Sequence, residues 1–444
     1  MSKSAIFRSA LLGLALWVGG PAHAETSPPG EAPSGLTAVS PLLIGQAVST
    51  ALARNRDIIA ARLDIETAQY DRVAASIYPN PVFSYGLGNI VLGQANPQYP
   101  PIQQPGAFGQ TQHSFAISEV VDIWAKRSAR LRAADEGLVV KRLLVEDALR
   151  EVVYQVRSGF MDALRAQEAG ELARQASSRY AETVRISRSR FAAGDIAENE
   201  LRKIELESLR YQTALIDAES ELDLARQKLA ALLGFATAEA LPAALAHTPG
   251  PSAAEPLPAL VERAAQQRPD LQAARQSRAA SAATLGAAQR EALPDISVSL
   301  SYQHSEFTAS GDNPNSLGVG VAFPLPLFDR NQASIGRARV EQKRAENSIE
   351  RAWLQVQQDV AGAARRRARA QLLLDSFDAG GMSERAESAL RVAEHAYKAG
   401  AASLLELLEA QRTYLDTRAQ YLRAQHEYRQ SLVEVSHATA GDMK

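Results

Sequence analysis

The two halves of this 444-residue chain share one order of elements, and this duplication limits the folds open to it more than any other feature. Four pairs of matched residues carry the alignment: Asp57 with Asp270, Pro81 with Pro294, Trp124 with Phe328, and Gly194 with Gly400. Their offsets are 213, 213, 204 and 206 residues, so the loops differ in length while the order is kept. We therefore expect one structural unit built twice.

Segment boundaries follow from changes in composition. Residues 1–24 predict a secretory signal peptide, because basic residues precede a short apolar stretch and Ala22-His23-Ala24 supplies the small residues of a cleavage site. Beyond it the composition predicts four segments: a flexible N-terminus at 25–40 rich in Pro, Gly and Ser, repeat 1 at 41–234, a Pro/Ala-rich linker at 235–256, and repeat 2 at 257–444. The chain is therefore expected to act outside the cytoplasm.

Each repeat reads as helix, strand, loop, strand, very long helix, glycine turn and helix. Helical patterns cover 42–77 and 257–293, ahead of the strands. Apolar residues that alternate with polar or small ones predict four strands, at about 81–92, 112–121, 295–304 and 316–325. Proline-free stretches predict the long helices at 124–193 and 329–396, with Gly380-Gly381 as a place where the second could be interrupted. The tips of the two repeats are expected at 191–200 and 397–409.

The long helices carry the apolar spacing of a coiled coil. Val145, Leu149, Val152 and Val156 are separated by 4, 3 and 4 residues, and the matched positions of repeat 2 keep the same steps. At 1.5 Å per residue, each helix would be roughly 100 Å long. The shorter helices before and after it, roughly 55 Å each, would together match that length. The sequence thus predicts a tall helical body.

The composition excludes several classes of function. A formal net charge of −2 argues against a nucleic-acid binder, and the absence of cysteine excludes disulfides, thiolate metal sites and cysteine nucleophiles. No catalytic motif or cofactor signature is visible, so we expect no enzyme and no cofactor. His304 and Glu306 form only a weak two-ligand metal pair, and the basic run Arg365–Arg367 with Arg369 is typical of a solvated helix face.

The four predicted strands fit a membrane. Strands of about eight to ten residues with one apolar face have the length of transmembrane β-strands. Four strands cannot close a barrel, and open edges are not tolerated in lipid, so insertion requires several chains, most simply three with twelve strands. A soluble sandwich with helical arms is the alternative, because alternation marks a half-buried strand in either setting.

From about Leu42 to Ala440 the chain resembles the TolC-like trimeric outer-membrane efflux ducts, in element order and in internal duplication. The most specific motifs are the two tip segments, 190–195 (RFAAGD) and 397–411 (YKAGAASLLELLEAQ). The segment 323–332 (FPLPLFDRNQ) is similar to the CzcC branch, whose members serve heavy-metal exporters. Some relatives carry a lipidated cysteine after the signal peptide, and this chain departs from them because it has no cysteine.

The resemblance implies a mainly α fold with a membrane β-barrel sector. Three copies would form a homotrimer with a twelve-stranded barrel in outer membrane lipid of a Gram-negative bacterium, continued by a periplasmic α-helical coiled-coil barrel. The implied partners are a periplasmic adaptor (membrane fusion) protein and an inner-membrane pump of the resistance-nodulation-division class. The tip, built from the Gly194 and Gly400 turns, would be closed at rest and open when the helices untwist.

The resemblance also points to acidic residues that follow the second tip glycine as a gate. Glu406 and Glu409 are three residues apart on one helix face, and Glu200 matches the position of Glu406 in repeat 1. Three copies would form carboxylate rings that favour cations, whereas the alternative is that these are ordinary solvated residues. Trp124 and Phe328 follow equivalent strands, so we expect them in an aromatic girdle or in packing at the barrel-to-helix junction.

The function that the resemblance favours is a passive exit duct for heavy-metal cations such as cobalt, zinc, cadmium or copper. A duct for drugs, solvents or secreted proteins is the alternative within the same class, because specificity would belong mainly to the pump. A periplasmic coiled-coil scaffold that never inserts into a membrane is the alternative from a different class.

Overall fold

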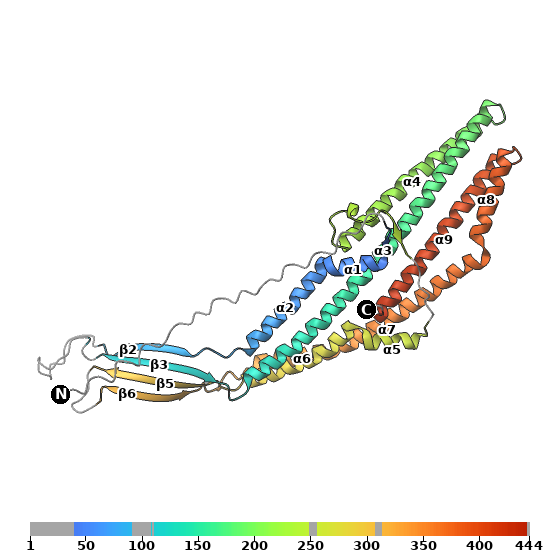
Figure 1. The fold of residues 1–444 in the computed structure, drawn as a ribbon. Helices are drawn as coiled ribbons and strands as arrows, with labels where there is room; N and C mark the ends of the chain where they lie inside the picture. Colours follow the sequence, from blue (N-terminus) through green and yellow to red (C-terminus); the bar gives the residue numbers. More distant parts are fainter. Residues whose placement is uncertain (1–39, 91–107, 109–110, 248–254, 307–312, 442–444) are drawn as a thin grey trace.

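The computed structural model describes residues 40–90, 108, 111–247, 255–306 and 313–441. Figure 1 shows a long, narrow molecule with a small sheet at one end and two helical hairpin tips at the other. The predicted signal peptide at 1–24 and all but Ser40 of the predicted flexible segment 25–40 lie outside the described residues. No helix within the described ranges is long and apolar enough to cross a membrane.

Four strands form one antiparallel sheet in the order β2-β3-β5-β6. Their bounds are Val82–Gly88 (β2), Gln112–Val121 (β3), Ile296–Ser305 (β5) and Asn315–Ala322 (β6). Two of them are shorter than expected. β2 ends before Asn89, whose φ of 54° leaves the extended region, and β6 ends before Pro324, which has no backbone donor to offer a neighbouring strand.

The long helix of repeat 1 is unbroken and that of repeat 2 is not. α3 runs over Lys126–Ala192, 67 residues, whereas α7 covers Gln332–Gly380 and α8 covers Met382–Lys398. The prediction of one helix over 329–396 is therefore wrong. Gly381 adopts φ 56°, a left-handed conformation that ends α7, and α8 begins at the next residue.

The helix ahead of each first strand is also divided, so the predicted single helices at 42–77 and 257–293 are wrong. Repeat 1 has α1 (Ile44–Arg54) and α2 (Arg56–Ser76), and repeat 2 has α5 (Leu257–Gln267) and α6 (Pro269–Glu291). Asn55 is extended and its side-chain oxygen accepts the N–H of Asp57 at 2.8 Å, which starts α2 as an N-cap. Pro269 disfavours the helical conformation at Arg268, which ends α5 there.

Part of the predicted linker 235–256 is packed structure. A 3₁₀ turn covers Ala238–Ala240, and β4 (Leu245–Ala246) pairs in parallel with β1 (Leu42–Leu43). Leu42, Leu241 and Leu245 are at most 5% exposed and join the core of repeat 1. The segment therefore covers the first repeat before the chain enters the second, and residues 248–254 lie outside the described residues.

The return helices complete two equivalent cores. α4 covers Glu198–Leu232 and α9 covers Leu404–Thr439. Val152 and Val156 lie in the core of repeat 1, and Val356 and Val360, each 204 positions later, lie in the core of repeat 2. These are the positions that the 4–3 spacing predicts to face a helical neighbour. In Figure 1 the short helices run beside α3 and α7 along most of the body.

Candidate functional site: the helical tips and the strand face

Each hairpin tip is closed by a left-handed glycine. Gly194 has φ 82° and Gly400 has φ 75°. In both turns the residue after the glycine donates its N–H back to the helix, Asp195 to the carbonyl of Arg190 at 2.9 Å and Ala401 to that of Ala396 at 2.8 Å. This is the hydrogen-bond pattern of a glycine C-cap, and it reverses the chain within a few residues. The structure thus places both glycines predicted for the tips at helix reversals.

The two tips are packed against one another by a small apolar cluster. Its buried members come from four helices: Val184, Ile204, Tyr397, Leu404 and Leu407. The Tyr397 hydroxyl lies 2.8 Å from the Ser187 hydroxyl, and Arg190 donates to the Tyr397 carbonyl at 3.2 Å while its guanidinium lies over the ring. The tip of repeat 1 is therefore bonded to the tip of repeat 2 within one chain.

Glu406 has a structural role at the start of α9. The Ser403 hydroxyl accepts the N–H of Glu406 at 3.3 Å, and the Glu406 carboxylate accepts the N–H of Ser403 at 3.1 Å. This reciprocal capping box stabilises the first turn of the helix. Any test of the charge of Glu406 must therefore keep the cap.

The other acidic tip residues are unpartnered side chains on the surface. Glu409 is exposed one turn beyond Glu406, and Glu200 is exposed in the first turn of α4 on the other hairpin. Neither forms an ion pair with any part of the chain that the structure describes. Their carboxylates are therefore available to water, to a pore or to a partner, and the structure does not join Glu200 to Glu406 within one chain.

One face of the sheet is lined by small and hydroxylated residues. The hydroxyls of Ser114, Ser299 and Ser301 each donate to the carbonyl of a glycine on the next strand, at 3.2–3.4 Å. A Cβ at Gly86 would lie 2.6 Å from the Ser114 hydroxyl, so any larger residue there would displace that hydroxyl from its bond. Within the four described strands, none of the residues that share this face with the serines is charged.

The opposite face of the sheet is exposed and mainly apolar, with one charged residue, Glu119, in the row that contains Val298. Two cross-strand rows make most of it: Phe83, Ile117, Leu300 and Val319, then Tyr85, Phe115, Tyr302 and Leu317. All eight are 39–76% exposed in the single chain. An apolar patch of this size on an isolated chain marks a surface that is covered by lipid or by another protein.

A polar row borders this apolar surface at the loop end of the sheet. The Tyr85 hydroxyl lies 2.9 Å from Nδ1 of His113, and the Tyr302 hydroxyl donates to Asn315 at 2.6 Å. Aromatic rings with their polar ends on one side are typical of a membrane interface. His304 bonds to Asn315, while Glu306 approaches His113 at 3.8 Å, so His304 and Glu306 have different partners. Among the described residues, no group of three or more His, Asp or Glu could hold a metal.

The junction between sheet and helices separates the two predicted aromatic residues. Nε1 of Trp124 donates to the Pro294 carbonyl at 3.0 Å, and this bond joins the turn before α3 to the segment that precedes β5 of the other repeat. Phe328 is 91% exposed and stands free of the chain. Trp124 therefore packs at the junction, whereas Phe328 is open to lipid or to a neighbouring molecule.

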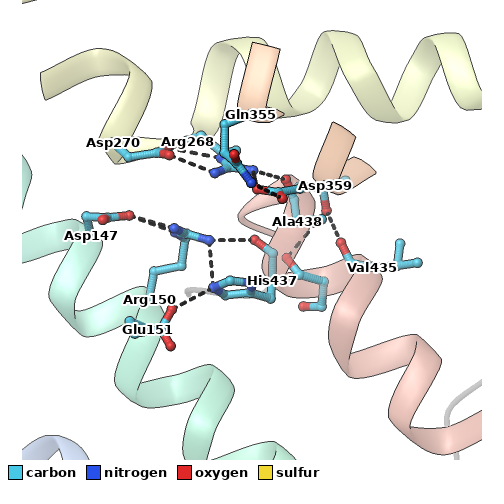
Figure 2. Close-up of polar contacts among 12 residues, drawn as sticks. Asp147, Arg150, Glu151, Arg268, Asp270, Gln355, Asp359, Val435, His437 and Ala438 are labelled. Atoms are coloured by element: carbon cyan, nitrogen blue, oxygen red, sulfur yellow. Dashed lines mark hydrogen bonds and ion pairs between the residues drawn. The ribbon is translucent and has the colours of Figure 1, made fainter. Parts of the chain in front are cut away.

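A polar cluster around two buried arginines, Arg150 and Arg268, lies at the end of α9 and has no counterpart in the sequence predictions. We call it the α9-end network; it consists of Asp147, Arg150, Glu151, Arg268, Asp270, Asp359 and His437 (Figure 2). Arg150 donates to the His437 carbonyl at 3.0 Å, and Arg268 donates to the Ala438 carbonyl at 3.4 Å. Two cations thus satisfy the last carbonyls of α9, where the helix dipole is negative. The one available signal was the alignment of Arg268 with Asn55.

Comparison with known proteins identifies this architecture. The family model described as "Outer membrane efflux protein" matches residues 47–235 and 260–441, which is most of both repeats. The chain belongs to this family. The protein is thus an outer membrane efflux channel and not an enzyme, as the sequence predicted, and its mainly helical, duplicated fold is that of the TolC-like channels.

Named relatives and solved structures agree with this family. The chain is 27% identical over 390 residues to the cobalt-zinc-cadmium resistance protein CzcC of Cupriavidus metallidurans, covering 87% of each chain. It is 26% identical over 412 residues to the cation efflux system protein CusC of Escherichia coli K12, covering 88% of this chain and 85% of that one. The crystal structure of the outer membrane protein VceC from Vibrio cholerae superposes with a TM-score of 0.70 at 19% identity, over 90% of this chain and 97% of that one.

Proposed function

We propose that three copies of this efflux protein form an exit duct for heavy-metal cations across the outer membrane. The observation that carries the proposal is the four-stranded sheet, with one exposed apolar face, one uncharged hydroxyl-lined face, and unpaired outer edges at β2 and β6. An open edge is costly in lipid, and pairing β6 of one copy with β2 of the next removes it. Three copies give twelve strands, with the hydroxyl-lined face toward the lumen.

Exposed apolar residues on both flanks of the helical body support the same assembly. On one flank, α2 exposes Leu63, Tyr70 and Val73, and α4 exposes Leu206, Leu209 and Ile216. On the other flank, α7 exposes Val340, Leu354 and Leu372. Of these helices, α2 leads into β2 and α7 follows β6. The strand edges that pair in the barrel would therefore be continued by helices that pack below it.

The duplication indicates which helices meet between copies. Within one chain, α3 packs against α9, with Arg150 against His437. Their repeat equivalents are Leu354 on α7, 204 positions after Arg150, and Ala231 on α4, 206 positions before His437. Both are exposed. We infer that α7 of one copy packs against α4 of the next, with Leu354 near Ala231.

A crosslink between these positions tests the assembly, and the cysteine-free chain makes it unambiguous. The variant A231C/L354C should give dimers and trimers on a denaturing gel after mild oxidation, and no larger species. The control A231C/V340C has its second thiol 14 residues away on α7, about 21 Å, and should stay monomeric on the gel. Equal crosslinking of the two variants, or ladders beyond the trimer, would refute the closed trimer.

The tips are proposed to form the periplasmic entrance. Gly194 and Gly400 form the turns, and Glu406, Glu409 and Glu200 supply carboxylates that three-fold symmetry would arrange in rings. Rings of carboxylates favour cations at a pore entrance. A periplasmic adaptor and an inner-membrane pump of the resistance-nodulation-division class would deliver the cargo there. We further infer that residues 1–24 are removed on export and that the two repeats form one continuous unit.

The substrate assignment is supported by the names of two relatives, CzcC and CusC, which refer to cobalt, zinc and cadmium resistance and to cation efflux. A strain that lacks the gene should become sensitive to one or more of these metals, and the wild-type gene should restore growth. Growth of the same strain should be measured with drugs in parallel. Sensitivity to drugs alone would contradict the metal assignment and would indicate a duct for organic compounds.

A further inference from the structure

The last turn of α9 is a contact between the two repeats. His437 belongs to repeat 2, and its imidazole packs on α3 of repeat 1. Tyr154 stacks on the ring with centroids 4.3 Å apart, Arg150 donates to Nε2 at 2.7 Å, and the Glu151 carboxylate lies 3.1 Å from the same nitrogen. Figure 2 shows the imidazole next to both side chains, with the Arg150 guanidinium held on its other side by Asp147.

The chemistry of Nε2 allows two arrangements of this contact. A guanidinium has donors only, so Arg150 can bond to Nε2 only while that nitrogen carries no proton. A proton on Nε2 would turn the nitrogen into a donor, which suits the Glu151 carboxylate and opposes Arg150. The same atom therefore lies between a donor that needs neutral His437 and an acceptor that needs the cation.

We propose that His437 is a proton-sensitive contact between the two repeats: when neutral it holds α9 to α3 through Arg150, and when protonated it turns to Glu151 and loosens the end of α9. Uptake of one proton at Nε2 is the whole change, and no covalent bond is made or broken. The Arg150 bond to the His437 carbonyl depends on the same placement of the helix end, so it weakens together with the imidazole bond.

Charged groups lie around His437 on every neighbouring element, and of these Arg150, Glu151 and Arg268 act on the charge of its imidazole. α3 contributes Arg150, Glu151 and Asp147; the α5–α6 break contributes Arg268 and Asp270; α7 contributes Asp359; and α9 contributes Glu434. Burial, followed by the charge of Arg150, lowers the pKa of His437 below its usual value, and Glu151 opposes this shift. His437 is therefore neutral in the closed arrangement at neutral pH.

The direction of the pH effect follows from this lowered pKa. When the end of α9 opens, the exposed imidazole regains a pKa of about 6.5 and takes up a proton that the closed form resists. Opening is therefore independent of pH above about 6.5 and is favoured as the pH falls below it. Between pH 7.5 and pH 5 the opening constant rises by up to about 30-fold.

Hydrogen exchange at residues 434–441 of the full-length protein in detergent measures this opening. After correction for the intrinsic rates, the wild type should lose protection there by up to about 30-fold between pH 7.5 and pH 5. His437→Gln keeps an acceptor for Arg150 but cannot titrate, so its protection should not change with pH. Retention of the wild-type response in His437→Gln would overturn the proposal.

Two further variants keep the test decisive if His437→Gln proves unstable. Because Glu151 favours the protonated imidazole, it should keep the wild-type response below the limit of about 30-fold. Glu151→Gln removes this partner and should raise the response toward that limit, whereas an unchanged response below the limit would contradict the two-partner arrangement. His426→Gln is the matched control, because His426 is another half-buried histidine of α9, 3.4 Å from Asp162 of α3. It should leave the acid response at 434–441 unchanged, and loss of the response in this control would assign it to general titration of α9.

Discussion

The two repeats have the same core but differ where their helices break and end. α3 continues for 67 residues, whereas its counterpart splits into α7 and α8 at Gly381. In repeat 1 the matched stretch of α3 contains Arg174 and Gln175, 206 positions before Gly380 and Gly381, and both are good helix formers. One duplicated unit thus supplies an unbroken helix and a jointed one to the same channel.

The second difference lies where a return helix ends against the break in the first helix. In repeat 1, Asn55 donates to the carbonyl of Leu232 at 2.9 Å, which ties the end of α4 to the α1–α2 break. In repeat 2, Arg268 occupies the matched position and donates to the carbonyl of Ala438 at the end of α9. The end of each return helix is therefore held by a matched side chain. In repeat 1 this side chain is the neutral Asn55, and in repeat 2 it is Arg268, which forms ion pairs with Asp270 and Asp359.

The largest expected effect comes from removing these two matched side chains. Arg268→Ala leaves two carboxylates without their cation and should destabilise the end of α9 by about 3 kcal/mol. Asn55→Ala removes an N-cap and one hydrogen bond and should cost about 1 kcal/mol at the end of α4. Hydrogen exchange at the two helix ends measures both. Equal losses would show that the charged attachment is no stronger than the neutral one.

Acid should distinguish the same two helix ends without any substitution. The end of α9 carries His437, whereas the matched position in α4 is Ala231, which cannot titrate. Because the pKa of His437 is lowered, the end of α9 should lose up to about 2 kcal/mol as the pH falls from 7.5 to 5. The end of α4 serves as the internal reference, and a parallel loss there would contradict the assignment to His437.

The break between α7 and α8 should depend on the glycine at position 381. Gly381→Ala forces an ordinary residue into a left-handed conformation, which costs about 1–2 kcal/mol and should lower the midpoint of thermal unfolding. Gly380→Ala is the control, since Gly380 is helical and its added Cβ meets only the flexible Met382 side chain at 3.3 Å. A larger loss in the control would show that the joint does not depend on the left-handed residue.

The smallest expected difference concerns the charges of the two tips. Glu406→Gln with Glu409→Gln keeps the capping box, because glutamine also serves at that position, and removes two carboxylates. Cation preference measured by reversal potential in a planar bilayer should fall. Glu200→Gln at the other tip should lower it less, because Lys203 already offsets that charge. Unchanged cation selectivity in the double variant would contradict the proposal that Glu406 and Glu409 form an acidic gate.

Local patterns were sufficient for much of the fold. Alternating residues located the strands, and the spacing of Val152 and Val156 identified core positions of a long helix. The breaks at Asn55 and Arg268 were missed, because an apolar pattern continues across a single extended residue. The capping role of Glu406 was also missed, although Ser403 three residues earlier is a visible capping-box signal.

The duplication, the strand faces and the glycine turns can be predicted from the order of amino acids alone, because each depends on neighbouring residues or on a period that repeats along the chain. The α9-end network, in contrast, is defined by contacts that form only in the folded chain. Arg150 and His437 are 287 residues apart, and Arg268 and Ala438 are 170 apart. Partners at such separations leave no periodic mark in a single sequence, and their hydrogen bonds exist only after the helices have packed and excluded water from the end of α9.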